Sequence, residues 1–249
     1  MSTRFAELDW QSTPIGELSL RRRREPVLDV DVYEVRLGDE FLMSSLFVVA
    51  EQALADLALA ELSLGLTGGL SGGLSGGLDV LVGGLGLGYT ARAVLADPRV
   101  ASLHVVEALP QVISWQEQGL LPGAEALTGD PRCHLVAGDF FALTAQGAAY
   151  GPQAPPSFST VLVDIDHTPS LHLHPSSAPF YAPAGLRRVA ERLHPGGVFG
   201  LWSDAAPDEA FLAALGEAFE AVAAHVVPFP NHHTGGTSTN TVYLGRRPR

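Results

Sequence analysis

The pattern of apolar and polar positions divides the chain into three stretches. In the first, residues 1–46, apolar and polar side chains alternate over residues 15–20 and again over residues 30–37, and a turn follows at residues 38–40. Alternation with a period of two is typical of β-strands with one buried face. We therefore expect a small antiparallel β region at this end of the chain.

Four consecutive arginines occupy positions 21–24, directly after the first alternating segment. A charged edge strand, whose arginines are solvated and prevent pairing with other chains, explains such a run. The alternative is a patch that binds an anion or an acidic partner. We favour the edge strand.

The second stretch, residues 47–78, changes from helix to linker. Residues 47–64 are rich in Ala and Leu, with acidic residues at 51, 56 and 61, which predicts an amphipathic helix. Residues 67–78 repeat a Gly-Gly-Leu-Ser pattern that cannot build a core of its own. This repeat predicts a flexible linker or surface loop.

The third stretch, residues 79–249, alternates buried strands with helices. Helices are predicted near residues 89–96, 109–118 and 180–193, and apolar strands are predicted at residues 79–84, 101–107, 133–137, 158–164 and 197–203. Strands that alternate with helices indicate a parallel sheet covered on both faces. Residues 222–229 and 239–245 have no helix between them, so we expect them to form an antiparallel hairpin that closes the sheet.

Composition excludes several classes of function. Lys+Arg number 15 against 27 for Asp+Glu, a net charge of −12, which disfavours binding to nucleic acid. All the basic residues are Arg, so a Schiff-base lysine and the phosphate-binding lysine of nucleotide hydrolases are excluded. One cysteine, Cys133, excludes an internal disulfide and a multi-cysteine metal site.

Hydropathy and the N-terminal residues bear on location. No apolar run reaches about 18 residues, so no membrane span is expected. The first ten residues lack the apolar segment of a signal peptide. We expect a soluble cytoplasmic protein.

A glycine-rich turn is the strongest functional signal. Gly83, Gly84, Gly86 and Gly88 follow a buried strand and lead into a helix that begins near Tyr89. Glycines allow positive φ angles and let a ligand approach the backbone, and the helix start offers unpaired N–H groups. A nucleotide-type ligand is expected at this turn.

Acidic residues follow the next two strands. Glu107 ends the second strand, where its carboxylate can accept hydrogen bonds from two ribose hydroxyls; a charge at a helix start is the alternative. Asp139 ends the third strand, where it can hold an adenine amine while Phe140 packs on the ring. A helix N-cap at Asp139 is equally consistent with the sequence.

More polar residues follow the fourth and fifth strands. Asp164, Asp166 and His167 lie after the fourth, at the sheet edge where open α/β sheets bind ligands. Asp164 closes an apolar strand and is our candidate for the catalytic residue. Asp166, His167 and, after the fifth strand, Trp202 are candidates for substrate binding, with loop capping the alternative for Asp166 and core packing for Trp202. The loop after the fourth strand is rich in Pro and Ser, and such a flexible loop does not hold side chains in the fixed geometry of a metal site, so no metal site is expected.

These motifs carry a resemblance to a known family. Residues 83–88, 105–107, 138–139, 163–164 and 194–198 resemble the spermidine synthase-like branch of the S-adenosylmethionine-dependent methyltransferase superfamily. The resemblance covers residues 79–204. It implies an α/β Rossmann-like methyltransferase sheet and a cofactor that is S-adenosylmethionine or its decarboxylated form. It also implies Glu107 on the ribose, Asp139 on the adenine and Asp164 near the sulfonium or the acceptor.

The chain departs from the polyamine-forming members of that family. They carry an Asp in the glycine turn that holds the cofactor's aminopropyl ammonium, and this chain has Leu87 there. After the fourth strand they carry a second acceptor-site Asp; in this chain the second Asp is displaced and His167 is inserted. They also carry a Tyr-His-Glu segment, for which the nearest match in this chain is residues 47–52. We therefore favour methyl transfer over aminopropyl transfer in polyamine biosynthesis. The acceptor is expected to be a small molecule, with an amine one option.

Other functions remain open on the sequence. A nucleoside-binding protein without catalysis would explain the missing acceptor-site acids. A nicotinamide-dependent oxidoreductase also fits the glycine turn and Glu107, although a second mononucleotide-binding half is absent. An N-terminal sheet next to an apolar helix is compatible with a homodimer.

Overall fold

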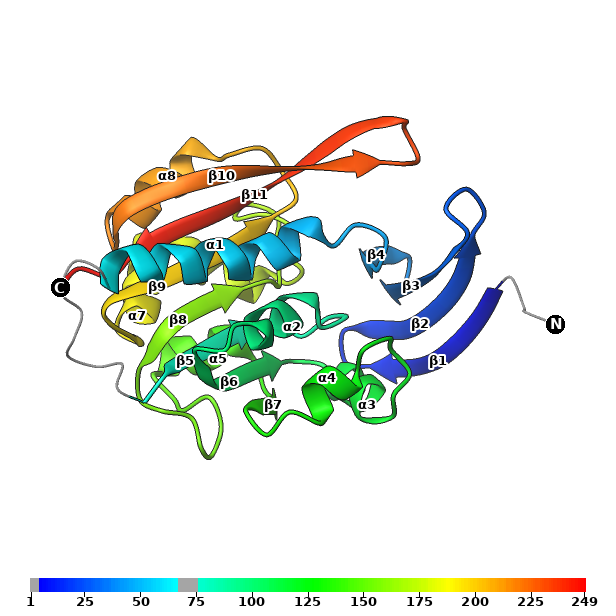
Figure 1. Ribbon diagram of the computed structural model, residues 1–249, viewed down its shortest axis with the longest axis horizontal. Helices are drawn as coiled ribbons and strands as arrows, with labels where there is room; N and C mark the ends of the chain where they lie inside the picture. Colours follow the sequence, from blue (N-terminus) through cyan, green and yellow to red (C-terminus); the bar gives the residue numbers. More distant parts are fainter. Residues whose placement is uncertain (1–4, 67–75) are drawn as a thin grey trace.

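The computed structural model describes residues 5–66 and 76–249, which form two β-sheets and the helices around them (Figure 1). The predicted linker lies mostly at residues 67–75, outside the described residues. The helix before it is α1, Val49–Leu66.

The larger sheet is seven-stranded, in the order β10-β11-β9-β8-β5-β6-β7. Its strands are β5 (Leu78–Gly83), β6 (Val100–Glu107), β7 (Cys133–Ala137), β8 (Phe158–Val163), β9 (Leu193–Ser203), β10 (Glu220–Asn231) and β11 (Gly236–Arg246). The strands from β5 to β9 pair in parallel, whereas β11 pairs antiparallel with both β9 and β10. The mostly parallel Rossmann-like sheet and its terminal antiparallel hairpin are confirmed.

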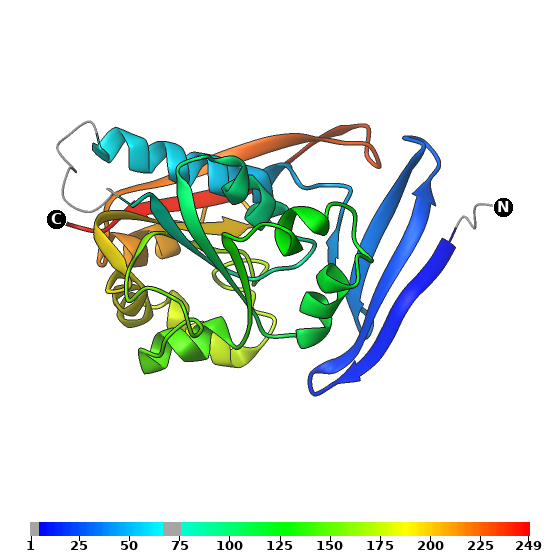
Figure 2. The ribbon, with the colours of Figure 1, turned by 60° about the horizontal axis from the view of Figure 1, so that its bottom comes forward.

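Helices cover both faces of this sheet (Figure 2). They are α2 (Tyr89–Ala96), α3 (Pro110–Glu117), α4 (Glu125–Thr128), α5 (Phe140–Gln146), α6 (Ala178–Tyr181), α7 (Pro183–Ala190) and α8 (Glu209–Gly216), with a 3-10 turn at Pro175–Ser177. One apolar core joins α1, α2 and α3 to the sheet. A second apolar core joins the four helices α5, α6, α7 and α8 to the sheet. The helix predicted at 180–193 is interrupted, because Ala182 is extended and Pro183 begins a new helix. The short helix α8 was not predicted.

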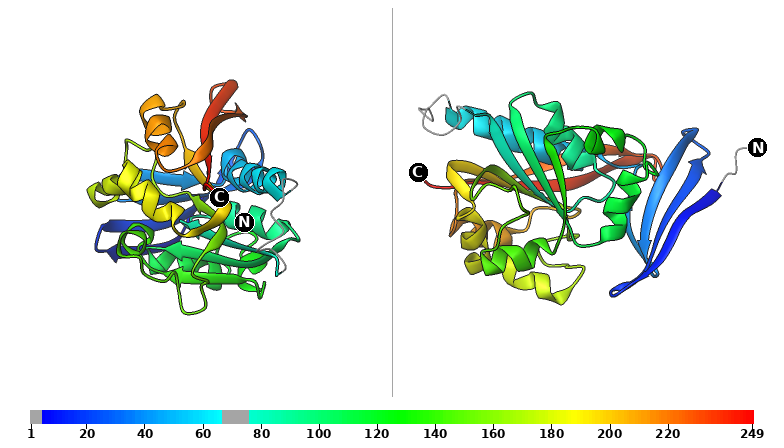
Figure 3. Two further views of the ribbon diagram at one scale, coloured as in Figure 1. Left: turned by 90° about the vertical axis from the view of Figure 1, so that its left-hand side faces the viewer. Right: turned by 90° about the horizontal axis from the view of Figure 1, so that it is seen from below.

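The smaller sheet stands at one end of the molecule, beyond the carboxyl ends of β5, β6 and β8 (Figure 3). It is antiparallel, in the order β1 (Phe5–Thr13), β2 (Gly16–Glu25), β3 (Val30–Leu37) and β4 (Glu40–Ser44). Its side chains Leu18, Leu20 and Val35 belong to the same core as α1 and α2. The Trp115 indole of α3 donates a 2.6 Å hydrogen bond to Asp9 of β1. The small sheet therefore covers the end of the large sheet at which β5, β6 and β8 terminate.

The prediction that the arginine run forms an edge strand was wrong. Arg21–Arg24 lie in β2, an inner strand that pairs with β1 on one side and β3 on the other. Neighbouring acids stabilise the run: Arg23 forms 2.6 Å ion pairs with both Glu25 and Glu34. Strand β1 was not predicted, although Ala6, Leu8 and Trp10 alternate with polar residues; a register shift between Glu7 and Asp9 interrupts its pairing with β2.

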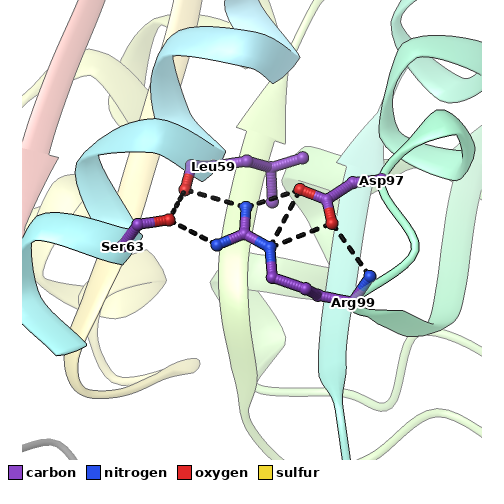
Figure 4. A network of polar contacts seen from close by, with 4 residues as sticks. All are labelled: Leu59, Ser63, Asp97 and Arg99. Atoms are coloured by element: carbon purple, nitrogen blue, oxygen red, sulfur yellow. Dashed lines mark hydrogen bonds and ion pairs between the residues drawn. The ribbon is translucent and has the colours of Figure 1, made fainter.

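A polar network anchors the far end of α1 (Figure 4). The Arg99 guanidinium, at the start of β6, donates to the Leu59 carbonyl at 3.3 Å and to the Ser63 hydroxyl. It also pairs with Asp97, whose carboxylate accepts from the Arg99 backbone N–H at 2.9 Å. This network joins α1 to the α2–β6 loop, on the side away from the carboxyl ends of the strands.

Candidate active site

The glycine turn after β5 requires its glycines for two reasons. Gly84, Gly86 and Gly88 all have positive φ angles, of 93°, 49° and 85°. A Cβ on Gly84 would lie 2.1 Å from the backbone oxygen of Asp164, so the two strand ends touch here. Gly88 is the N-cap of α2 and offers no side-chain cap, so the first turn of the helix faces the site with free N–H groups.

Glu107 lies at the end of β6 and is 9% exposed. One carboxylate oxygen accepts from the backbone N–H of Leu85 at 3.0 Å, and the other accepts from Leu109 at 2.8 Å. Burial raises the pKa of Glu107, and these backbone donors oppose that rise. The carboxylate therefore holds the glycine turn in place at the position predicted to bind ribose.

Asp139 and Phe140 begin α5. The exposed Asp139 caps the helix, accepting from the N–H of Ala142 at 3.0 Å. The Phe140 ring is 2% exposed and packs beneath Gly83 and against Tyr150, with ring centroids 5.7 Å apart. Its neighbour Phe141 is half-buried, and both rings line the smaller of the two cavities described below. The N-cap is observed, and the predicted contacts with adenine stay a prediction.

Asp164 follows β8 and is half-buried. Its carboxylate accepts a 2.7 Å hydrogen bond from the hydroxyl of Thr90, in the first turn of α2. Burial raises the pKa of Asp164 to about 6, and the hydrogen bond from Thr90 acts in the opposite direction. A carboxyl with such a pKa is a stronger base than an ordinary aspartate.

A second acid, Glu51 of α1, was missed as a site residue. Glu51 and Asp164 both line the larger of the two cavities described below. The Oε2 atom of Glu51 is buried without a hydrogen-bond partner among the described residues. Burial, followed by the charge of Asp164, raises the pKa of Glu51 to about 8. Two carboxyls that share one desolvated space favour a proton or a cation between them. The sequence signal for Glu51 was the segment that starts at Phe47, which we had interpreted only as a departure from the Tyr-His-Glu segment of the family.

The other candidate residues separate into two groups. Asp166 is 2% exposed and accepts from the N–H of Leu173 at 2.7 Å and from the hydroxyl of Tyr181 at 2.9 Å. Its partners lie in the loop after β8 and in α6, and it lines neither cavity described below, so the structure does not place it in the space that Asp164 lines. His167 and Trp202, in contrast, line the same cavity as Asp164.

Contacts from other elements position these two side chains. The His167 ring lies 3.2 Å from Glu40 and 3.9 Å from Asp204. With the Asn240 amide turned so that its oxygen faces the indole, Trp202 donates to it at 3.2 Å. His167 thus links the small sheet to the loop after β9, and Trp202 forms a cavity wall.

Two cavities meet at the end of β8. The smaller, of about 100 Å³, is bordered by Glu107, Asp139, Phe141 and Leu173. The larger, of about 340 Å³, extends along the glycine turn and contains Glu51, His167 and Trp202. The two share Leu42, Met43, Gly86, Asp164 and Ile165. Asp164 therefore lies where a ligand in one cavity would meet a ligand in the other.

The described residues contain no group of three or more His, Cys, Asp or Glu that could hold a metal ion. No helix among them is both long enough and apolar enough to cross a membrane.

Several solved structures share the fold of this chain at low sequence identity. A spermidine synthase in complex with the transition-state analogue AdoDATO superposes with a TM-score of 0.70 at 13% identity, over 96% of this chain and 73% of that one. Spermidine synthase from Thermotoga maritima gives 0.67 at 15% identity, over 96% and 72%. Human methyltransferase-like protein 13 in complex with SAH gives 0.50 at 20% identity, over 80% of each chain.

Comparison of the sequence alone finds no such match: no family model and no curated protein matches this chain. The likeness therefore lies in the arrangement of the sheets, including the small N-terminal sheet that the first two comparisons cover. The chain has the spermidine synthase-like variant of the Rossmann-like methyltransferase fold.

Proposed function

We propose that this protein is a transferase that moves a carbon group from an adenosyl sulfonium, S-adenosylmethionine or its decarboxylated form, to a small-molecule acceptor. The position of Asp164 carries this proposal, because it lines both the small and the large cavity. The donor's adenosine would occupy the small cavity, and the acceptor would occupy the large one. The ligands of two neighbours of the same fold, AdoDATO and SAH, are consistent with this class of donor.

The residues of the small cavity fit a nucleoside. Glu107 borders this cavity with a carboxylate that the backbone N–H groups of Leu85 and Leu109 hold in place, and its two oxygens are suited to accept from two ribose hydroxyls as well. Asp139 can accept from the exocyclic amine of adenine, and the half-buried Phe141 offers a face for the ring. Gly84 and Gly86 both border this cavity, and without side chains there a ligand can approach the backbone of the turn.

Asp164 would act on the acceptor. A sulfonium supplies an activated carbon, so the protein has to align the nucleophile and remove its proton. The raised pKa of Asp164 suits it to take that proton near neutral pH. Thr90 orients the carboxylate through its 2.7 Å hydrogen bond.

Methyl transfer to an amine is the reaction we favour. Leu87 is 6% exposed and lines the large cavity where polyamine-forming relatives carry an Asp, so it offers no carboxylate to an aminopropyl ammonium. In this assignment, the carboxyls of Glu51 and Asp164 face the acceptor amine.

Aminopropyl transfer is the second candidate, and a different observation favours it. No Arg or Lys lines the large cavity among the described residues, whereas Glu51 and Asp164 do. The tail of S-adenosylmethionine carries a carboxylate, which these acids would repel. The decarboxylated donor carries an ammonium alone, which they would attract.

Titration calorimetry with the two donors in parallel tests both assignments. We expect micromolar-range binding of one donor and of its thioether product, S-adenosylhomocysteine or methylthioadenosine. Tighter binding of the decarboxylated donor would shift the assignment to aminopropyl transfer. If no donor or thioether binds, the transferase proposal fails. Binding without turnover on a panel of amines would instead support a nucleoside-binding protein without catalysis.

A further inference from the structure

Aromatic side chains line the large cavity beside its acid pair. They come from five separate parts of the chain: Phe41 from β4, Phe47 from the segment before α1, Tyr89 from α2, Trp202 from β9 and Phe229 from β10. The Phe47 and Phe229 rings contact each other, with centroids 5.5 Å apart. The small sheet and the terminal hairpin thus both contribute to one apolar wall, which suits a ligand with a flat apolar body.

The charges in this cavity are unequally distributed. Its acidic lining residues among those described are Glu51, Asp164 and Asp204, and its one ionisable base is His167. Asp204 already lies 3.9 Å from His167 and is exposed at the surface. The buried, unpartnered oxygen of Glu51 and the carboxylate of Asp164 therefore form one cation-binding position in the cavity.

We infer that the acceptor is an amine with a single ammonium group on an aromatic or bulky apolar body, its nitrogen held by Glu51 and Asp164 and its body packed against Phe47, Trp202 and Phe229. This inference rests on the proposed function for the fate of the amine. The binding position itself rests on the cavity alone.

A linear diamine fits this lining less well. Its first ammonium would occupy the acid pair, and its second would have to lose water against phenyl rings or compete with His167 for Asp204. Phenyl faces offset part of such a desolvation cost, but less than a carboxylate does. An aromatic monoamine leaves no charge unpaired.

The reaction balances on this arrangement. The ammonium loses one proton to Asp164, and the nitrogen lone pair then forms a bond to the donor carbon. The bond from that carbon to sulfur breaks, and its electron pair stays on sulfur, which becomes a neutral thioether. The product nitrogen carries one more carbon group.

Amine binding is measured by calorimetry on the full chain saturated with methylthioadenosine, and again on the free protein. The ligands are 2-phenylethylamine, its neutral analogue 2-phenylethanol, and 1,4-diaminobutane. We expect 2-phenylethylamine to bind at least about 10-fold more tightly than either of the others. Equal or tighter binding of 1,4-diaminobutane overturns the inference.

Proton release gives an independent readout for the ammonium position. With a pKa of about 8, the Glu51 carboxyl is largely protonated at pH 7, and an ammonium beside it should displace that proton. Titrations in two buffers of different ionisation enthalpy should show release for the parent and not for Glu51→Gln. The control is Glu117→Gln, an exposed acid on α3. Release that persists in Glu51→Gln contradicts this placement.

The aromatic wall is tested with Phe47→Leu and Trp202→Leu. Both should weaken 2-phenylethylamine about 10-fold or more, whereas Phe5→Leu, at an exposed ring on β1, should not. Unchanged affinity in both variants overturns the assignment of the wall.

Failure of the proposed function is distinguishable from failure of this inference. If neither thioether binds, the transferase proposal fails, and the titrations of the free protein still decide the amine site. If methylthioadenosine binds and no amine does, the inference fails while the transferase proposal stands.

Discussion

The hydroxyl of Thr90 donates to the carboxylate of Asp164 at 2.7 Å, which joins the first turn of α2 to the end of β8. The same hydroxyl lies 3.2 Å from the Glu51 carbonyl of α1. Three elements thus meet at one buried side chain beside the large cavity. Thr90 limits how far burial can raise the pKa of Asp164, because its hydrogen bond favours the charged form.

Replacing Asp164 by Asn should remove the base and keep the shape. Turnover with an amine acceptor should fall at least about 100-fold, the scale expected for loss of a general base. Thioether binding by calorimetry should change little, and thermal stability should not fall, because a desolvated charge is removed. In Thr90→Val the pKa of Asp164 should rise, which moves the acid limb of the pH–rate profile upward. Full activity in Asp164→Asn would refute the base role.

Replacing Glu51 by Gln should stabilise the protein at alkaline pH. The folded pKa of Glu51 is raised from 4.5 to about 8, so the unfolded chain loses this proton at a lower pH than the folded one. The stability that the protonated carboxyl contributes is present below about pH 4.5 and is lost as the pH rises toward 8. The Tm of Glu51→Gln should therefore exceed that of the parent by a few degrees at pH 8.5 and by less at pH 5. Each kcal/mol in the free energy of unfolding corresponds to a Tm shift of about 2–4 °C for a chain of this size. A difference that does not depend on pH would count against the raised pKa; Glu117→Gln is the control.

Glu107 should matter for both ligand binding and folding. Glu107→Ala leaves the N–H groups of Leu85 and Leu109 without their acceptor, so unfolding should become easier by about 1–3 kcal/mol. Thioether affinity should fall roughly 10- to 100-fold, because charged hydrogen bonds to the ribose are lost. Denaturant unfolding and calorimetry measure the two effects, with Asp56→Ala, an exposed acid of α1, as the control. An unchanged dissociation constant would remove Glu107 from the site.

Gly84→Ala should damage the site far more than its size suggests. The added Cβ would lie 2.1 Å from the Asp164 backbone oxygen, at a φ of 93° that L-residues rarely adopt. Gly38 also has a positive φ, of 58°, but a Cβ there meets nothing within 4 Å. Thermal melts should show a large loss for Gly84→Ala and one of about 1 kcal/mol for Gly38→Ala. Similar losses in both variants would mean that the turn can move away from β8.

His104 should make the fold sensitive to acid. Its ring is 2% exposed, lies tilted against that of His134 with centroids 4.6 Å apart, and has both nitrogens unpartnered among the described residues. Burial, followed by the charge of His134, lowers its pKa below 6.5, so acid protonates the unfolded chain first and stability falls as the pH drops below about 6.5. The Tm advantage of His104→Phe over the parent should therefore grow between pH 7.5 and pH 5. A constant difference would refute this, and His232→Phe, at an exposed position, is the control.

The location of the site could be predicted because it depends on the carboxyl ends of parallel strands. Glu107, Asp139 and Asp164 each follow a strand whose apolar run is evident in the sequence, and parallel pairing brings all three to one edge. The glycine turn was equally evident, since its glycines lie between a buried strand and a helix. Such features depend on neighbours in the chain, so local patterns identify them.

Side-chain direction could not be predicted in the same way. Asp166 and Asp164 are two residues apart, yet Asp166 accepts from Tyr181 of α6 and lines neither cavity, whereas Asp164 lines both. Phe140 is buried beneath Gly83, which leaves room for its ring, and Phe141 beside it is half-buried, although both border the small cavity. Each outcome was decided by a partner that the local pattern does not reveal.

The strands of the large sheet, the glycine turn and the edge where acids gather are evident in the sequence, because periodic burial and glycine conformation act over a few residues. The inner position of the strand with Arg21–Arg24 and the entry of Glu51 into the cavity depend on tertiary packing. The pKa values of Glu51 and Asp164 depend on the same packing, and the bond from Thr90 to Asp164 joins residues 74 positions apart. Desolvation and pairing arise where distant segments meet, and so the chemistry of this site is a property of the folded chain.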